Sequence, residues 1–394
     1  MIQRPNRPIY LDNQATTPCD PRVVQAMLPF FTEHFGNPHS AEHTMGRFAE
    51  SAVETARGHV AALIGADPRE VVFTSGATES NNIAIKGAAR HAARSGDGRR
   101  RVVTVQTEHK CVLEAAADLA AEGFEPVVLP VRPDGTVDPA AVRTALEEAP
   151  TLLLSVMAVN NEIGVLQDLT GLAAMAHEAG ALFHTDAAQA AGKIPLDVEA
   201  MKIDLLSISG HKLYGPKGVG ALHVRRRPRV RLAALFSGGG QERGLRSGTL
   251  PAPLIVGLGE ACRIALVEME ADSRRIAGLR DRLMAGLERA IPGLVLNADS
   301  ERRIPGNVNL TFPGSDAQAM MAAMPDLCVS TGSACSSAEV EPSYVLTALG
   351  LSDAAAARTL RIGIGRFTSP SDIDAAVSML ARAHAMAAPQ PSEA

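Results

Sequence analysis

The sequence lacks several features that would place it in a particular class of protein. It has no tryptophan, its formal net charge is −5 at pH 7, and none of its apolar runs approaches the length needed to span a membrane. Residues 1–12 contain no apolar segment like that of a secretory signal peptide. Because a negative net charge gives no global attraction to nucleic acid or to an anionic membrane, we expect neither as a direct partner.

The cysteines also lack the paired spacing of a metal site, such as C-x-x-C. The whole chain has five of them, an odd number, and free thiols are typical of a reducing cytoplasm. The sequence therefore predicts a cytoplasmic protein with no metal-ligating residues of its own.

What the sequence does contain is a long alternation of strands, polar turns and helices, which favours an α/β fold with a mainly parallel sheet. Its 394 residues are enough for two domains that share a large core. We expect a large domain of residues 16–260 and a smaller α+β domain formed by residues 1–15 and 261–394. The seven strands predicted for the large sheet are Val71–Thr74, Val102–Val105, Pro126–Pro130, Leu152–Val159, Ala181–Thr185, Leu205–Ile208 and Gly220–Val224.

Long amphipathic helices are predicted on either side of this region. One spans Met45–Ile64 and ends at Gly65, a residue type typical of the position after a helix. Another runs from about Ala261 to Ile291 and opens the smaller domain.

The ligands of such a sheet bind beyond the carboxyl ends of its strands, so the residues that follow each strand test for a site. Five of the predicted strands are followed by polar groups with useful chemistry. These groups are Ser75-Gly76-Ala77-Thr78, Thr107-Glu108-His109, Asn160-Asn161-Glu162, Asp186 with Gln189, and Ser209 with His211 and Lys212.

Lys212 is the residue around which we predict the site. It follows the strand that ends at Ile208, where a partly desolvated amine loses its proton and becomes a nucleophile. An aldehyde such as pyridoxal phosphate would condense with it as a Schiff base. The alternative is a surface turn whose lysine is simply solvated.

The turn before the helix that begins near Ala77 and Thr78 suits a phosphate. Small residues let the backbone approach a ligand, and free N–H groups with the helix dipole favour negative charge. Ser209 and His211 would supply further donors to the same phosphate, whereas an ordinary strand–helix turn is the alternative.

Three polar residues would contact the ring of such a cofactor. Asp186 ends a strand, and a carboxylate buried there needs a cation such as a pyridinium nitrogen, unless it only caps the next helix. Gln189 would hydrogen-bond the phenolic oxygen of the ring. His109 would lie flat against the ring or transfer protons, or it would be a core histidine bonded to backbone.

Two more residues point to a substrate. Arg361 is a charge inside an apolar strand, so it needs either a substrate carboxylate held in a bidentate fork or a structural ion-pair partner. Cys335 lies in a Ser/Gly loop without large side chains, which suits an exposed thiolate nucleophile or carrier. The other cysteines lack that setting, and we expect them to be packing residues.

Two polar segments allow more than one interpretation. Residues 238–249 form a glycine-rich loop with two arginines, which would reach a phosphate in its own or a neighbouring subunit or remain a mobile surface loop. The basic run 225–231 is either a solvated strand end or a docking surface for an acidic partner.

Together these motifs resemble those of the cysteine desulfurases, the fold-type I pyridoxal phosphate enzymes that supply sulfur for iron–sulfur clusters. The resemblance runs from Tyr10 to about Met379, and the cysteine loop is similar to that of the branch with a long loop. The matching motifs are Ser75-Gly76-Ala77-Thr78-Glu79-Ser80-Asn81, Thr107-Glu108-His109-Lys110, Asn160-Asn161-Glu162-Ile163-Gly164, Ser209-Gly210-His211-Lys212, Arg246-Ser247-Gly248-Thr249 and Gly332-Ser333-Ala334-Cys335.

The resemblance implies a homodimer with pyridoxal phosphate as cofactor, and it implies a role for each residue. Lys212 would form the Schiff base, Cys335 would carry a persulfide, and Asn161 with Arg361 would fix the substrate carboxylate. His109 would act with Lys212 and Cys335 in catalysis. The remaining cofactor contacts would be Ala77, Thr78, Asn161, Asp186, Gln189, Ser209 and His211, joined by Thr249 of the partner subunit.

The implied activity converts L-cysteine to L-alanine and passes the sulfur of the Cys335 persulfide to an acceptor, such as an iron–sulfur scaffold protein or a tRNA-thiolation relay. The rival enzymes are an aminotransferase or a selenocysteine lyase of the same fold. A rival of another class is a non-catalytic sulfur carrier or assembly subunit, but a pure binding role needs neither Lys212 nor Asp186.

The chain departs from the family pattern in two places. Asn13-Gln14 replace the commoner Tyr-Ser, and the chain stops soon after its last helix. Housekeeping members carry a longer tail that helps to dock the scaffold protein, so the resemblance does not extend to that contact.

Overall fold

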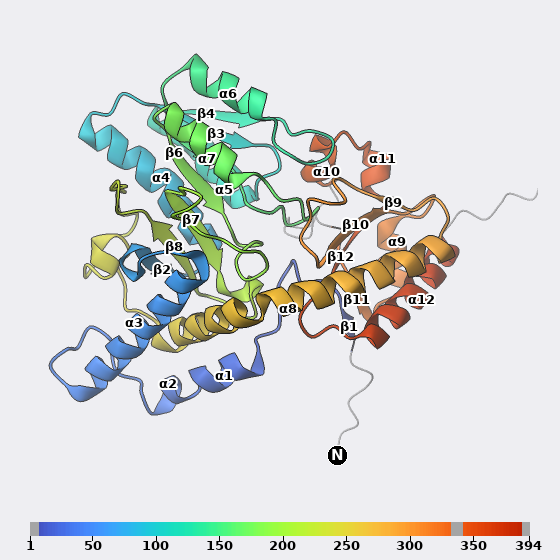
Figure 1. The fold of residues 1–394 in the computed structure, drawn as a ribbon, viewed down its shortest axis with the longest axis horizontal. Coiled ribbons are helices and arrows are strands. Elements are labelled where there is room, and N and C mark those ends of the chain that lie inside the picture. The colour runs from blue at the N-terminus through green and yellow to red at the C-terminus, as the bar shows by residue number, and fades with distance from the viewer. Residues whose placement is uncertain (1–7, 332–341, 388–394) are drawn as a thin grey trace, which may run out of the picture.

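The computed structural model describes residues 8–331 and 342–387. Its largest element is a seven-stranded sheet in the order β2-β8-β7-β6-β5-β3-β4 (Figure 1). The strands are β2 (Val71–Thr74), β3 (Arg101–Val105), β4 (Glu125–Leu129), β5 (Thr151–Ser155), β6 (Leu182–Asp186), β7 (Leu205–Ser209) and β8 (Gly220–Val224).

The pairings from β7 through β6, β5 and β3 to β4 are parallel, whereas β8 runs antiparallel to both β7 and β2. The α/β fold with a mainly parallel sheet is therefore confirmed. The predicted strands lie where the structure has them, but Leu152–Val159 is too long, because β5 ends at Ser155. Beyond that point the N–H of Met157 donates to the Glu108 carboxylate and not to a strand carbonyl group.

Helices cover both faces of this sheet. The helices of the described residues are α1 (Pro21–Met27), α2 (Pro29–Thr32), α3 (Thr44–Ile64), α4 (Ala77–Ser95), α5 (Lys110–Asp118), α6 (Pro139–Glu148), α7 (Leu169–Glu178), α8 (Ala252–Ala290), α9 (Ala317–Ala323), α10 (Tyr344–Ala348), α11 (Asp353–Ala356) and α12 (Pro370–Ala387), of which α9 to α12 lie outside the layers on the large sheet. The predicted end of the first long helix is confirmed, since α3 stops at Ile64 and Gly65 adopts a left-handed φ of 66°. Among the described residues, no helix is long and apolar enough to cross a membrane.

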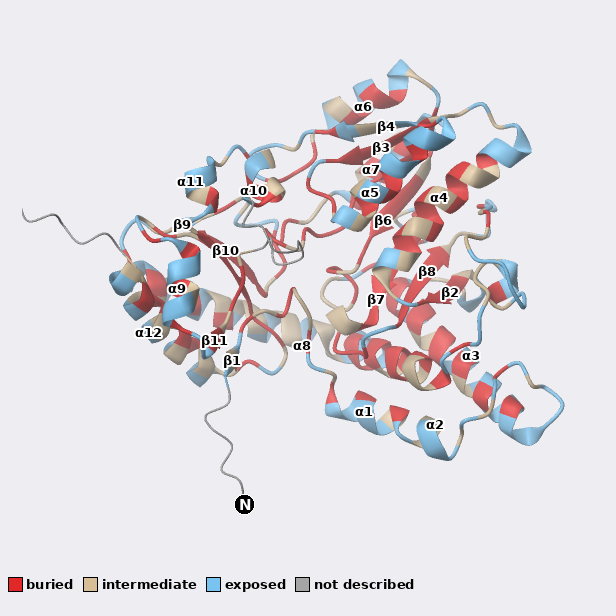
Figure 2. Ribbon diagram, turned by 180° about the vertical axis from the view of Figure 1, so that it is seen from behind, coloured by how far each residue is buried: buried red, intermediate tan, exposed pale blue. Residues whose placement is uncertain are grey.

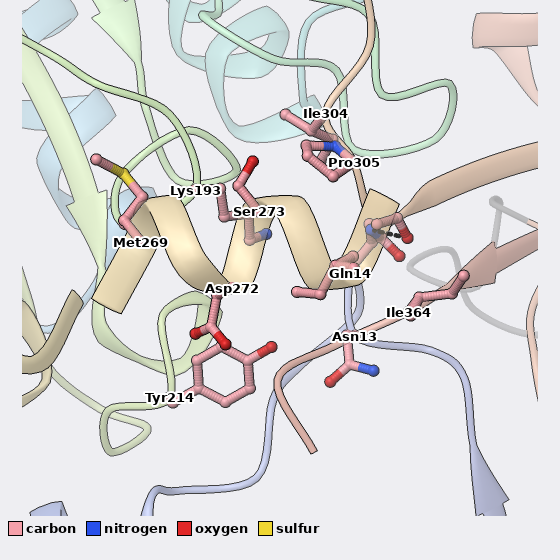
Figure 3. A pocket seen from close by; sticks show the side chains of 13 residues that line it. Asn13, Gln14, Lys193, Tyr214, Met269, Asp272, Ser273, Ile304, Pro305 and Ile364 are labelled. Carbon is pink, nitrogen blue, oxygen red and sulfur yellow. Dashed lines mark hydrogen bonds between the residues drawn. The ribbon is translucent and has the colours of Figure 1, made fainter. Parts of the chain in front are cut away.

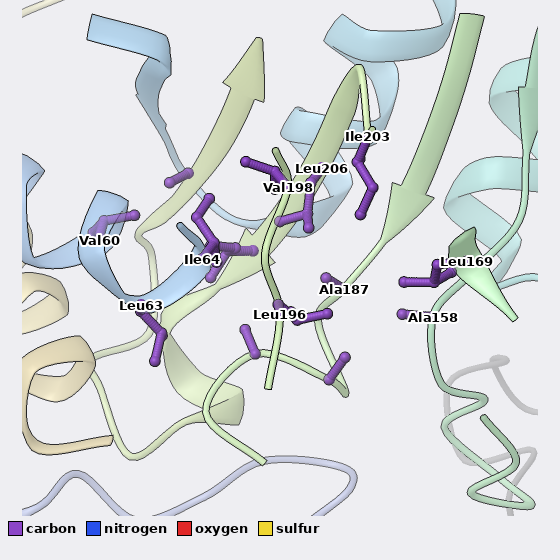
Figure 4. Close-up of a cluster of buried hydrophobic side chains, with 14 of the residues drawn as sticks. Val60, Leu63, Ile64, Ala158, Leu169, Ala187, Leu196, Val198, Ile203 and Leu206 are labelled. Atoms are coloured by element: carbon purple, nitrogen blue, oxygen red, sulfur yellow. The ribbon is translucent and has the colours of Figure 1, made fainter. Parts of the chain in front are cut away.

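Alternating side chains of the strands fill two separate cores. Val71 and Phe73 of β2 pack with α3, α6, α7 and the first half of α8, whereas Val72 packs with α4 and α5 on the other face. Figure 4 shows the first of these cores, and Figure 2 shows that the strands between the helix layers are buried. The sheet is therefore covered on both faces, so that its strand ends are the places where polar side chains can meet a ligand.

The C-terminal part of the chain builds a second, smaller unit. Its strands are β9 (Val295–Leu296), β10 (Asn307–Thr311) and β12 (Thr359–Gly363), which form an antiparallel sheet in the order β12-β10-β9. Near the N-terminus, β1 (Ile9–Tyr10) pairs in parallel with β11 (Leu327–Cys328), and Leu11 packs into the core of this unit.

Helix α8 joins the two units (Figure 1). Its first half packs against α3, where Gly259 permits close approach, because a Cβ there would lie 2.5 Å from the Cα of Ala56. Its second half contributes Leu279, Leu283 and Leu287 to the core of the smaller unit. The predicted division between residues 260 and 261 falls inside this helix, and it stays a prediction.

The glycine-rich loop 238–249 is anchored to the large unit by a buried ion pair. Both carboxylate oxygens of Glu242 accept hydrogen bonds of 2.8 Å from the guanidinium of Arg57, and one of them also accepts the N–H of Phe73 at 2.8 Å. The Arg57 guanidinium lies 4.6 Å from the centre of the Phe73 ring. At least this part of the loop is fixed to α3 and β2.

Replacing Glu242 with alanine would leave the buried Arg57 cation with only the exposed carboxylate of Glu54 as an ion-pair partner, and the Phe73 N–H without its acceptor. We expect the free energy of unfolding to fall by about 3–5 kcal/mol, measured by urea denaturation at fixed protein concentration. The matched control is Glu270→Ala, which removes the exposed partner of Arg274 and should cost less than about 1 kcal/mol. Equal effects of the two substitutions would contradict the anchoring role of Glu242.

Candidate active site

A cavity of about 450 Å³ opens at the carboxyl ends of β2, β3, β5, β6 and β7. The structure brings most of the predicted site residues together there. Those that line it are Ala77, Thr78, His109, Asn161, Asp186, Gln189, Ser209, His211, Lys212 and Arg361. Two predicted residues are not among them, because Thr249 is exposed on the loop before α8 and Cys335 lies outside the described residues.

Lys212 ends a short 3-10 helix, Gly210–Lys212, that directly follows β7. Its Nζ donates hydrogen bonds to the carbonyl oxygens of Gln14 at 2.6 Å and Ala15 at 2.7 Å. The amine is therefore held by the N-terminal segment at the wall of the cavity, and Lys212 is not a solvated turn residue.

The N-terminus of α4 forms the opposite corner of the cavity. Gly76 precedes the helix with a φ of 149°, and a Cβ there would meet only the Ser209 Oγ, at 3.7 Å. The bare backbone thus faces the cavity next to the N–H groups of Ala77 and Thr78, which suits an anion. Burial, together with the positive charge of Lys212, lowers the pKa of His211 to about 4, so at neutral pH its ring is uncharged.

Asp186 is the last residue of β6 and is buried. Its Oδ1 accepts the N–H of Ala188 at 2.9 Å, and its Oδ2 accepts the Asn81 amide at 2.7 Å. No cation within residues 8–331 and 342–387 forms a salt bridge with this carboxylate. Asp186 therefore caps the following turn, as the alternative interpretation proposes, and still lacks the cationic partner that a buried carboxylate requires.

His109 precedes α5 as its N-cap residue, and its Nδ1 accepts the backbone N–H of Cys111 at 3.2 Å. Burial lowers the pKa of His109, although the nearby charge of Asp186 opposes that shift. Cys111 also lines the cavity, with its Sγ 3.1 Å from the His109 Nδ1, and burial raises the pKa of its thiol to about 12. Cys111, which we expect to be a packing residue, thus also borders the cavity, and its packing role stays a prediction.

Gln189 is held from two sides. Its Nε2 donates to the carbonyl oxygen of Gln14 at 2.8 Å, and its Oε1 accepts from the Nζ of Lys193 at 2.8 Å. Lys193 also borders a smaller cavity of about 40 Å³ beneath α8, shown in Figure 3 with Gln14 and Tyr214. Burial, with the charges of Lys212 and Arg361, lowers the pKa of Lys193 to about 7.

Arg361 combines both roles that its sequence context allows. Its Nη2 donates to the Asp12 carboxylate at 2.9 Å and its Nη1 to the carbonyl oxygen of Asn161 at 3.1 Å. Its buried Nε, however, has no hydrogen-bond partner among the described residues, and neither has the buried Oδ1 of Asn161. Arg361 lines the cavity, and a guanidinium group with an unsatisfied nitrogen at the cavity wall suits a carboxylate ligand.

These features fit pyridoxal phosphate. The open N-terminus of α4 matches its phosphate, the unpaired carboxylate of Asp186 matches its ring nitrogen, and the amine of Lys212 matches its aldehyde. The unsatisfied edge of Arg361 remains for the carboxylate of an amino acid.

The class-V aminotransferase family matches this chain over residues 9–376. The cysteine desulfurase of mitochondria from Arthroderma benhamiae is 56% identical over 369 residues, which cover 94% of this chain and 73% of that protein. The chain belongs to the cysteine desulfurases of the class-V aminotransferase family. Members of this family depend on pyridoxal phosphate, and it is the cofactor of this chain.

Other relatives support the same assignment. The cysteine desulfurase IscS of Rickettsia felis is 52% identical over 379 residues, 96% of this chain and 92% of that protein. A solved structure described as SspA in complex with cysteine is 37% identical, has a TM-score of 0.80, and covers 91% of this chain and 99% of its own.

Sequence reasoning misses several residues that shape this site. Asn81 lies one helical turn after Thr78, and Cys111 lies two residues after His109, so proximity to a predicted contact is the signal that finds them. The carbonyl groups of Gln14 and Ala15 carry no side-chain signal at all, because any residue supplies a backbone carbonyl.

Replacing Lys212 with alanine tests the first assignment. We expect the variant to keep its fold, because Lys212 lies at the cavity wall and not in a hydrophobic core, but to lose the lysine-bound absorbance band of the cofactor. Turnover should fall by about a thousandfold or more. The matched control is Lys86→Ala, which removes a lysine that pairs with Asp118 and does not line the cavity. Undiminished turnover of the Lys212→Ala variant would rule the assignment out.

Proposed function

We propose that this chain is a cysteine desulfurase that removes sulfur from L-cysteine, releases L-alanine and carries the sulfur as a persulfide on Cys335. The observation that carries the proposal is the meeting of Lys212, Asp186 and Arg361 in one cavity. A lysine suits the cofactor aldehyde, a buried carboxylate suits its ring nitrogen, and an arginine with an unsatisfied Nε suits an amino-acid carboxylate.

The residues act on the substrate in a fixed order. Arg361 and Asn161 bind the cysteine carboxylate and so orient its Cα toward Lys212. Bound pyridoxal phosphate supplies an electron sink conjugated to that Cα. The Nζ of Lys212 then takes the Cα proton. The Asp186 carboxylate would stabilise the positive charge on the ring nitrogen, and that charge favours the withdrawal of electrons from the Cα.

Sulfur transfer requires a second nucleophile. The thiolate of Cys335 forms a bond with the substrate sulfur, the substrate C–S bond breaks, and its electron pair stays with the carbon that becomes the alanine methyl group. In the described part of the chain Cys111 is the cysteine that lines the cavity, and burial raises its thiol pKa to about 12. It therefore stays protonated, which supports Cys335 as the sulfur carrier.

We also propose a homodimer in which Thr249 reaches the phosphate of the partner subunit. Thr249 is exposed, and its loop is tied to the phosphate corner by Arg246, whose Nε donates to Glu79 at 2.8 Å. Glu79 in turn accepts the N–H of Ser75 at 2.7 Å. These contacts bring the base of the loop close to the site, which supports a role for its exposed residues at a subunit boundary.

The sulfur acceptor is proposed to be a protein such as an iron–sulfur scaffold. The basic run offers exposed arginines at Arg226, Arg227 and Arg229, which supports an acidic docking partner. Arg225 is different, because it is half-buried and pairs with Asp204. A cytoplasmic location stays a prediction.

The Cys335→Ser substitution separates a desulfurase from an aminotransferase or lyase of the same fold. We expect normal cofactor loading, loss of the protein persulfide in mass spectrometry, and sulfide formation reduced by about a thousandfold or more. The control is Cys328→Ser, seven positions earlier, which should leave sulfide formation unchanged. If Cys335→Ser released alanine and sulfide at the wild-type rate, an aminotransferase or lyase reading would replace the proposal.

A further inference from the structure

A chain of hydrogen bonds behind the cavity joins two of its walls. It runs from the Asp186 carboxylate through the Asn81 amide and the Cys111 thiol to the imidazole of His109. We propose that Asn81 and Cys111 are positioning residues that couple Asp186 to His109 and hold His109 as the tautomer protonated at Nε2. This inference rests on the proposed function for the assignment of Asp186 and His109 as cofactor contacts.

Asn81 is the branch point of this chain. It is fully buried on α4, and its Nδ2 lies 2.7 Å from the Asp186 Oδ2 and 3.1 Å from the Cys111 Sγ. An amide nitrogen has two N–H donors, so it can serve both acceptors at once. A flipped amide would place its oxygen against the carboxylate oxygen and lose that bond, which fixes the orientation of Asn81.

Cys111 passes the interaction on to His109. Because the thiol sulfur accepts from the side chains of Asn81 and Thr78, its own S–H remains available for the His109 Nδ1, 3.1 Å away. The backbone N–H of Cys111 points to the same nitrogen at 3.2 Å. Two donors that converge on Nδ1 make it the acceptor, so the ring proton lies on Nε2.

The alternative for these groups is an ion pair of thiolate and imidazolium, as in cysteine nucleophiles. The surroundings oppose it on both sides, since burial raises the pKa of the Cys111 thiol and lowers the pKa of His109. The charged groups that face His109 are Asp186, Lys212 and Lys110. Burial, together with the charge of Asp186, raises the pKa of Glu108 well above its ordinary value.

Two consequences follow for the cavity. The hydrogen bonds at Nδ1 oppose a 180° rotation of the neutral His109 ring. The Nε2–H of the ring therefore faces away from Cys111. The thiol of Cys111 is occupied and uncharged, so a second cysteine lies in the cavity without competing for sulfur.

The test uses the cofactor-loaded enzyme with Cys111→Ala and Cys111→Ser. The S–H donor favours the neutral imidazole, so its loss should raise the pKa of His109. We expect the acidic limb of the kcat/KM profile and of the cofactor absorbance titration to move to higher pH in Cys111→Ala. The value of kcat should fall by roughly two- to tenfold, with KM for cysteine little changed.

Cys111→Ser keeps a hydrogen-bond donor, so the acidic limbs of its kcat/KM profile and of its absorbance titration should lie at their wild-type positions. If Cys111 had a purely structural role, neither limb would move in Cys111→Ala. Cys262→Ala is the packing control, because Cys262 is fully buried in α8 away from the cavity. Unshifted limbs in Cys111→Ala, or equal shifts in the alanine and serine variants, would overturn the inference. The absorbance titration needs no turnover, so it still reports on Cys111 if the wild-type enzyme forms no sulfide.

Discussion

The arrangement of the site depends on one buried negative charge, the carboxylate of Asp186 at the end of β6. Its charge adds to burial in raising the pKa of Glu108 and of the Cys111 thiol, and it opposes the effect of burial on the pKa of His109. The neutral forms of the Glu108 carboxyl group and the Cys111 thiol are therefore favoured, which leaves the Asp186 carboxylate as the counter-charge for a cofactor ring. The parallel sheet makes this possible because it delivers Asp186, His109 and Lys212 to one edge from three different strands.

A second constraint is the N-terminal segment, which crosses between the two units of the fold. The carbonyl oxygen of Gln14 accepts from both Lys212 and Gln189, while Asp12 pairs with Arg361 of the smaller unit. The lysine that meets the cofactor and the arginine that suits the substrate are thus positioned by neighbouring residues of one short stretch. A shift of this segment would alter both ends of the site together.

Much of the fold could be predicted from the sequence, because its strands are short apolar runs bounded by turn residues and its helix ends carry capping residues such as Gly65. Residues at strand ends, such as Asp186 and Lys212, could be placed in one site by topology alone. Hydrogen bonds between residues that lie far apart in the sequence could not be predicted in this way. The bond from Asn81 to Asp186 spans 105 positions and that from Arg361 to Asp12 spans 349, and no local pattern encodes either partner. Cys111 was indistinguishable from a packing residue for the same reason, since only the folded chain shows what its thiol contacts.

The most direct test of the role of Asp186 is the nitrogen-15 chemical shift of the ring nitrogen in enzyme loaded with labelled pyridoxal phosphate. The shift reports whether that nitrogen carries a proton. The account predicts a protonated ring nitrogen in the wild-type enzyme at mildly alkaline pH and an unprotonated one in the Asp186→Asn variant, where the counter-charge is gone. An unprotonated ring nitrogen in the wild-type enzyme, or a protonated one in both proteins, would contradict it.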